Sequence, residues 1–127
     1  MNLNETEMEK FRAGWKKMEL DRNRKNALLR KKALSEVEHI SGILSEKYGV
    51  RKIILFGSLL DEDRFGERSD IDIAVEGLDE SAYFKALGKI LMASSFSVDL
   101  VPIEDASELL LKRLEKGKVV YERGQST

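Results

Sequence analysis

The chain has 127 residues, a formal net charge of −1 and no cysteine. This length predicts one domain with a modest core, and a content of 42% hydrophobic and 35% charged residues is typical of a soluble globular protein. The lack of cysteine excludes disulfide frameworks and thiolate metal sites, which is consistent with a reducing cytoplasm. The near-neutral charge argues against a strongly basic nucleic-acid binder, and no segment has the pattern of a signal peptide or a membrane span.

Asn2 to Lys47 has the composition of a helical region, with no proline. Two apolar stripes recur there at helical spacing, and they comprise Met8, Phe11, Trp15 and Met18, followed by Ala33, Val37, Ile40 and Leu44. The pattern fits either two helices or one long bent helix. We place residues 1–32 in an N-terminal helical extension and residues 33–127 in the main domain. The first stripe either packs on its own domain or contacts a second copy or a partner.

A charged segment, residues 16–32, lies between the stripes and is rich in lysine and arginine. Such a segment is usually a solvated helix face, although it can also attract RNA or an acidic partner surface. His39 is the only histidine, so the sequence gives no support to Ser–His or Cys–His nucleophilic catalysis.

Two apolar runs lie in the middle of the sequence, the first followed by a glycine and the second containing acidic residues. The first runs from Ile53 to Phe56 and stops at Gly57-Ser58, and the second contains Asp70 and Asp72. β-Branched and aromatic runs of this length predict buried strands, and strand alternation then points both carboxylates to the same side. Because adjacent carboxylates repel, the pair indicates a divalent metal site that faces the Gly-Ser turn.

The Gly-Ser turn has the features of a phosphate site. Gly57 allows close approach of the backbone to a ligand, and Ser58 is placed to cap a short helix from Leu59 to Asp63. Helix N-termini favour anions, and Mg²⁺ prefers one or two carboxylates together with phosphate oxygens. The stretch therefore predicts nucleotidyl-group chemistry.

The remaining sequence predicts an alternation of helices and strands. Asp79 is a candidate cap for a helix from Glu80 to Met92, and the next strand, Ser97 to Ile103, carries a third acidic residue, Asp99. A last helix is expected from Ala106 to Lys116, and residues 119–121 can form a short edge strand.

The ordered set of Gly57-Ser58, Asp70-Ile71-Asp72 and Asp99 resembles the signature of the DNA polymerase beta-like nucleotidyltransferase superfamily, and the small size resembles its minimal nucleotidyltransferases (MNT). The resemblance covers about residues 36–123. It implies an α/β fold in which a small mixed sheet is flanked by helices, here with an N-terminal helical extension. It also implies that the three acidic positions converge.

The resemblance further implies a nucleotidyltransferase that uses two Mg²⁺ ions and ATP. Asp70 and Asp72 would hold both ions, Asp99 would complete the ion at the attacking oxygen, and Gly57 with Ser58 would hold the β and γ phosphates. Many relatives carry a basic residue directly after the Gly-Ser pair, whereas Leu59 and Leu60 follow it here. The positive charge for the phosphates is therefore expected from Arg64, Arg68 or a partner.

Minimal nucleotidyltransferases similar to this one are paired with helical HEPN-family ribonucleases, as antitoxins. The resemblance therefore implies transfer of AMP from ATP onto a hydroxyl of a protein partner. Two alternatives stay open: a binding module that neutralises its partner without turnover, and nucleotidyl transfer to a small molecule. A cytoplasmic protein is expected, with the N-terminal helix as a candidate surface for self-association and with nucleic acid not expected as a main ligand.

Overall fold

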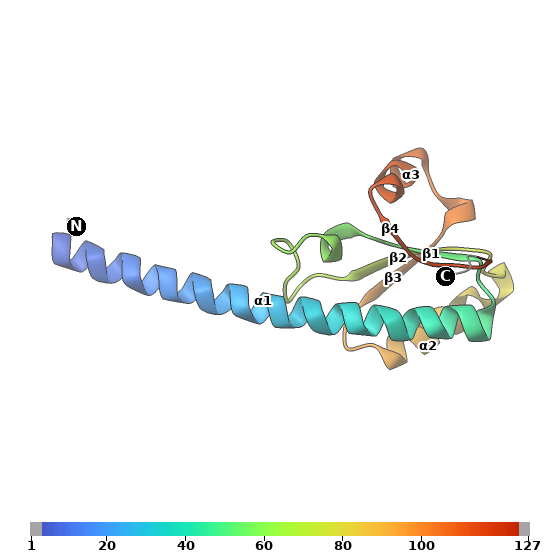
Figure 1. Ribbon diagram of the computed structural model, residues 1–127, viewed down its shortest axis with the longest axis horizontal. Helices are drawn as coiled ribbons and strands as arrows, with labels where there is room; N and C mark the ends of the chain where they lie inside the picture. The colour runs from blue at the N-terminus through green and yellow to red at the C-terminus, as the bar shows by residue number, and fades with distance from the viewer. Residues whose placement is uncertain (1–3, 125–127) are drawn as a thin grey trace.

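One continuous helix of 44 residues, α1 (Glu5–Tyr48), is the longest element of the computed structural model, which describes residues 4–124 (Figure 1). The Asn4 side chain accepts a hydrogen bond from the Glu7 N–H at 2.8 Å, and the Glu7 carboxylate accepts one from the Asn4 N–H. This capping box starts the helix, and Gly49 ends it with a φ of 64°. The single long helix is the correct alternative, and its expected first residue, Asn2, lies outside the described residues.

The two apolar stripes of α1 have different surroundings. Ala33 and Ile40 are fully buried in the main core, whereas Phe11 and Trp15 are 63% and 56% exposed. The N-terminal half of the helix projects beyond the sheet (Figure 1). Packing of the first stripe on its own domain, one of the two interpretations of the sequence, is therefore wrong. The helix continues past the point where the sheet ends (Figure 1), so the described part of the domain leaves those side chains exposed.

The sheet is mixed and has four strands in the order β3-β2-β1-β4. The strands are β1 (Lys52–Phe56), β2 (Ile71–Glu76), β3 (Val98–Pro102) and β4 (Lys118–Glu122). β2 and β3 are parallel, and β1 is antiparallel to both β2 and β4. The expected small mixed sheet and the C-terminal edge strand are thus confirmed.

Helices cover both faces of this sheet. α1 and α2 (Tyr83–Ala93) lie on one face, and α3 (Glu108–Glu115) lies on the other (Figure 1). Burial on both faces explains why β1 is a continuous apolar run rather than an alternating one. None of the helices in the described part of the chain is long and apolar enough to cross a membrane.

Three short 3₁₀ helices complete the described chain: η1 (Gly57–Leu60), η2 (Glu80–Ala82) and η3 (Ile103–Asp105). η2 precedes α2, and the Asp79 side chain caps it by accepting a hydrogen bond from the Ser81 N–H, as expected. The expected helix from Leu59 to Asp63 with Ser58 as its cap is wrong. The turn already starts at Gly57, so Ser58 lies inside it and no side chain caps its start.

The fold predicts that, of the two halves of α1, only the C-terminal half contributes to the stability of the domain. Ile40→Ala should lower the free energy of unfolding by about 2–4 kcal/mol, because it leaves a cavity in the main core. Leu20→Ala on the same helix is the matched control. It should change the value by less than about 0.5 kcal/mol, because Leu20 is exposed. Urea denaturation followed by circular dichroism measures both, and an equal loss for the two variants would contradict this account of the core.

Candidate functional site

Two carboxylates lie side by side at the end of the sheet where β2 and β3 begin. Asp72 and Asp99 are each the second residue of a strand, and they are direct partners in the parallel register of β2 and β3. Phe56, the last residue of β1, lies opposite Asp72 on the other side. Because Ala74 packs against Leu114 of α3, and strand side chains alternate, Asp72 points to the face that α3 covers. The convergence expected from the sequence is therefore present for these two residues.

The pKa of Asp72 reports on this arrangement. Burial is the largest cause that raises the pKa of this carboxyl, to about 6, and the neighbouring charge of Asp99 is the second. Asp70, an exposed residue directly before β2, raises the pKa further, whereas Arg113 lowers it. Asp99 and Asp70 thus both disfavour the charged form of Asp72, and a cation at this carboxylate would relieve that repulsion.

Gly57 brings the turn after β1 into direct contact with Asp72. The residue has a φ of 81°, a conformation that other residues rarely adopt. A Cβ atom at this position would collide with the Asp72 carboxylate and would lie 3.0 Å from its Cγ. Only glycine therefore lets the backbone of η1 approach the carboxylate this closely. This gives a physical reason for glycine in the predicted Gly-Ser turn.

An open hollow of about 850 Å³ lies in front of Asp72. Its lining includes the two predicted turn residues and three basic side chains, namely Gly57, Ser58, Arg64, Arg113 and Lys116. The volume is in the range of small-molecule sites, and the basic groups suit a ligand that carries several negative charges. The predicted nucleotide-binding residues Gly57, Ser58 and Arg64 are therefore gathered in one place.

Arg68, the other basic residue predicted to bind nucleotide, is not part of this hollow. It lines a second hollow beside α1, together with Arg22 and Lys25. Arg64 lies between the two hollows and lines both, whereas Arg68 lines only the hollow beside the long helix.

Arg113 and Lys116 are residues that the sequence alone did not identify. Arg113 lies in α3, and its guanidinium carbon is 5.2 Å from the centroid of the Phe56 ring. This cation–π contact holds the positive charge beside Asp72. The helical spacing of Leu110 and Leu114 predicts which side of α3 is buried, but it does not predict which face of the sheet α3 covers. Without the strand order, nothing places Arg113 near the carboxylates.

No group of three or more His, Cys, Asp or Glu side chains between residues 4 and 124 has the geometry of a metal cage. The donor set nevertheless fits Mg²⁺, which takes one or two carboxylates and completes its shell with substrate phosphates and water. Asp72 and Asp99 supply two carboxylates, and the open hollow in front of Asp72 leaves room for a ligand beside them.

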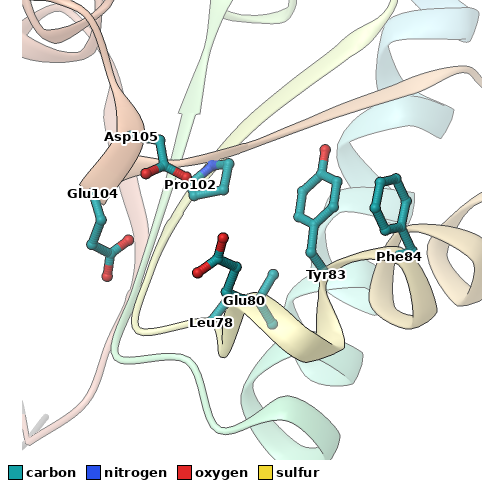
Figure 2. Close-up of a pocket in the computed structure, with 7 residues that line it drawn as sticks. All are labelled: Leu78, Glu80, Tyr83, Phe84, Pro102, Glu104 and Asp105. Atoms are coloured by element: carbon teal, nitrogen blue, oxygen red, sulfur yellow. The ribbon is translucent and has the colours of Figure 1, made fainter.

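A different pocket, of about 480 Å³, lies at the opposite end of the β2–β3 pair (Figure 2). Tyr83 and Phe84 of α2 line it, and Figure 2 shows three carboxylates around it, those of Glu80, Glu104 and Asp105. With acidic side chains as its only charged groups, this pocket is unsuited to a triphosphate. The edge formed by Gly57 and Asp72 is therefore the better candidate for phosphate chemistry.

Part of this chain matches the model of a known protein family. A family model described as polymerase beta, nucleotidyltransferase matches residues 38–126. The match includes the Gly57 turn and all three acidic positions, and it begins within the C-terminal half of α1. No relative was found among curated proteins.

Solved structures of toxin–antitoxin complexes are similar to this chain. One, with AMP-PNP, has 31% identity and a TM-score of 0.57, with 69% of this chain and 75% of that chain covered. A second, an MntA complex mutated at two aspartates, has 29% identity, a TM-score of 0.57 and coverage of 71% and 75%. A third contains a tri-AMPylated HEPN toxin of Shewanella oneidensis with an MNT antitoxin, at 30% identity, a TM-score of 0.52 and 72% coverage of both chains.

The family model covers most of the sequence, including the strands and the turn that carry the carboxylates, and one similar structure is 31% identical with 75% of that chain covered. The chain therefore belongs to the polymerase beta nucleotidyltransferase family, and within it to the minimal nucleotidyltransferases (MNT).

Proposed function

We propose that this chain transfers AMP from ATP, with the help of divalent metal, onto a hydroxyl group of a protein partner. The partner would be a HEPN-family ribonuclease, for which the chain acts as antitoxin. The observation that carries the proposal is the pairing of Asp72 with Asp99 in register, directly against the turn at Gly57. This combination places metal-binding carboxylates beside a backbone that can approach phosphates closely.

Asp70, Asp72 and Asp99 are the residues that would hold Mg²⁺, and we propose two ions as in the expectation from the sequence. When bound, the metal supplies positive charge to the phosphates of ATP and thereby favours attack at the α-phosphorus. The raised pKa of Asp72 supports this role, because a carboxylate held among other acidic groups gains most from a cation.

The side chains around the hollow have separate tasks in the proposed transfer. Gly57 and Ser58 hold the β and γ phosphates, and Arg113 and Arg64 orient them through charge-assisted hydrogen bonds. The acceptor hydroxyl oxygen attacks the α-phosphorus, the bond to the bridging oxygen breaks, and pyrophosphate leaves. Asp99 is exposed beside Asp72, so it is placed to accept the proton of the incoming hydroxyl.

We propose a protein hydroxyl, in particular that of a tyrosine, as the acceptor. The hollow is open, and no second domain of the described chain encloses a small acceptor. One similar complex is described as containing a tri-AMPylated HEPN toxin, and another as containing AMP-PNP. A third carries glutamate in place of two aspartates that are two positions apart, which is the spacing of Asp70 and Asp72 here.

One observation favours a second candidate function, a binding module without turnover. Three acidic residues, Asp61, Glu62 and Asp63, line the hollow on the side of η1, where they would repel a triphosphate. If their repulsion outweighs the attraction of the three basic side chains, the chain neutralises its partner by occlusion alone. ATP binding and AMP transfer separate the two functions, and the following predictions test each step.

The first prediction concerns the cation site. The folded state raises the pKa of Asp72 from 3.8 to about 6, so this group favours folding below pH 3.8 and that contribution is lost as the pH rises through 6. In chelator at pH 8, Asp72→Asn should therefore raise the free energy of unfolding, by about 1 kcal/mol after discounting for solvent screening. At pH 3.5 the difference should vanish. Urea denaturation at both pH values is the measurement.

The same experiment with added Mg²⁺ should stabilise the wild type and leave Asp72→Asn unchanged, because the metal binds the folded state through this carboxylate. Equal stabilisation of both proteins would place the cation elsewhere.

The second prediction concerns nucleotide affinity. Arg113→Ala should weaken binding of ATP with Mg²⁺ by about tenfold or more, because it removes a basic group beside Asp72. Lys112→Ala removes the same charge from the neighbouring position, which does not line the hollow, and should have little effect. Isothermal titration calorimetry measures both, with circular dichroism as the control for folding. Equal affinities for the two variants would contradict this orientation of the phosphates.

The third prediction concerns the transfer itself. With ATP and Mg²⁺, the HEPN partner should gain one or more AMP units by intact-mass spectrometry. Asp99→Asn should lower the rate at least about a hundredfold, equivalent to about 2.7 kcal/mol of transition-state stabilisation, with a smaller loss of ATP affinity. Asp105→Asn, an exposed carboxylate at the other end of β3, is the control that should retain the rate. No mass gain while neutralisation persists would favour the binding module.

A further inference from the structure

The N-terminal half of α1 carries an apolar surface that the domain does not cover. We call Met8, Phe11, Trp15 and Met18 the outer stripe. The side chains of Phe11, Trp15 and Met18 are 63%, 56% and 67% exposed. Most helices in proteins gain their stability by packing an apolar face against another element. The outer stripe is therefore a surface suited to another helix.

The outer stripe lies on the same side of α1 as the residues that pack on the sheet. Trp15 and Ala33 are 18 residues apart, as are Phe11 and Leu29, and 18 residues make five full turns of an α-helix. Ala33 is fully buried in the main core. The outer stripe thus continues the packing face of α1, and Figure 1 shows the N-terminal part of this helix projecting past the end of the sheet.

The loop between η1 and β2 marks where the domain begins on this face. The Arg30 Nε donates a hydrogen bond to the Leu59 carbonyl at 3.0 Å, and Lys25 forms an ion pair with Glu67. Next to these contacts lies the hollow of about 670 Å³ that was described above for Arg68. Its basic lining comprises Arg22, Lys25, Arg64 and Arg68, against Asp21 and Glu67. The described part of the domain therefore makes no contact with the outer stripe, and its first contacts with this face of α1 begin at a basic surface near residue 22.

The charges at the two ends of this free segment are opposite. The first turns of the helix, residues 5–12, carry three glutamates and two basic residues, a net charge of −1. The hollow at the far end carries four basic and two acidic side chains, a net charge of +2. Two such segments placed side by side in opposite directions bring each acidic end to the other copy's basic hollow. A parallel arrangement would bring like charges together, and it would also press the two domains into each other because both lie on the packing face.

We propose that the outer stripe pairs with the outer stripe of a second copy of this chain, in an antiparallel dimer with two-fold symmetry. The symmetry axis passes near Ala13, the midpoint of the stripe. Met8 then lies opposite Met18 of the second copy, and Phe11 lies opposite Trp15, so that each aromatic ring gains an aromatic neighbour. The first turn of each copy reaches the basic hollow of the other. This inference is independent of the proposed function.

Oligomeric state in solution is the first test. Light scattering after size exclusion, on the full chain alone, should give twice the monomer mass of 14.5 kDa and a concentration-dependent return to the monomer on dilution. The double variant Phe11→Ser/Trp15→Ser should be monomeric at the same concentrations. Its domain should still melt cooperatively, since neither side chain packs on the core.

A matched control removes equally exposed apolar groups from other sides of α1. Leu20 and Leu28 are 57% and 70% exposed, and their helical positions point away from the outer stripe. Leu20→Ser/Leu28→Ser should therefore leave the dimer intact. Equal dissociation by both double variants would overturn the assignment of the interface.

The orientation can be tested by disulfide cross-linking, because the natural chain has no cysteine. A mixture of Met8→Cys and Met18→Cys chains should form the mixed disulfide on mild oxidation, whereas Met8→Cys alone should not cross-link. Efficient cross-linking of Met8→Cys with itself would mean a parallel pair and would overturn the proposal. A chain that stays monomeric at every concentration, with Trp15 fluorescence changing only when the HEPN protein is added, would overturn it in favour of the heterologous partner.

Discussion

The pairing of two carboxylates, Asp72 and Asp99, in adjacent strands is the constraint on which the candidate site depends. Parallel pairing of β2 and β3 places the two carboxylates side by side, and the turn at Gly57 closes over Asp72 from the other strand. A fold optimised for stability alone would not gather these groups, because burial and the neighbouring charge of Asp99 both raise the pKa of Asp72 and so disfavour its charged form. The arrangement is therefore understandable as a site that is completed by a bound cation and phosphate.

The rest of the sheet offsets this local cost. Both faces are covered, and β1 supplies buried residues to two separate cores on its alternating sides. α3 has two roles in this arrangement, because Leu114 buries the face that carries Asp72 and Arg113 lies over the Phe56 ring. The same short helix thus contributes both packing and the positive charge that partly compensates the carboxylates.

The sequence was sufficient for the parts of the fold in which local pattern and burial agree. Asp99 was correctly expected on the side opposite to the core residues Val98 and Leu100, because strand alternation alone decides the side on which it points. Ser58 was misjudged, since a 3₁₀ turn that starts at Gly57 leaves no place for a side-chain cap. Arg113 was missed for a different reason. Its position depends on which face of the sheet α3 covers, and that choice is made by strand order, which no local pattern records.

Helix α1 shows most clearly what periodicity can and cannot determine. Trp15 and Ala33 occupy equivalent positions five turns apart, yet Ala33 is fully buried and Trp15 is 56% exposed. The helix repeats the same face along its length, whereas the sheet against which it packs ends near the loop between η1 and β2. The matched family region begins at residue 38, so the fold requires only the C-terminal part of the helix. The apolar residues of the N-terminal half therefore serve contacts outside the domain, and the opposite charges at the ends of that segment favour an antiparallel copy of itself.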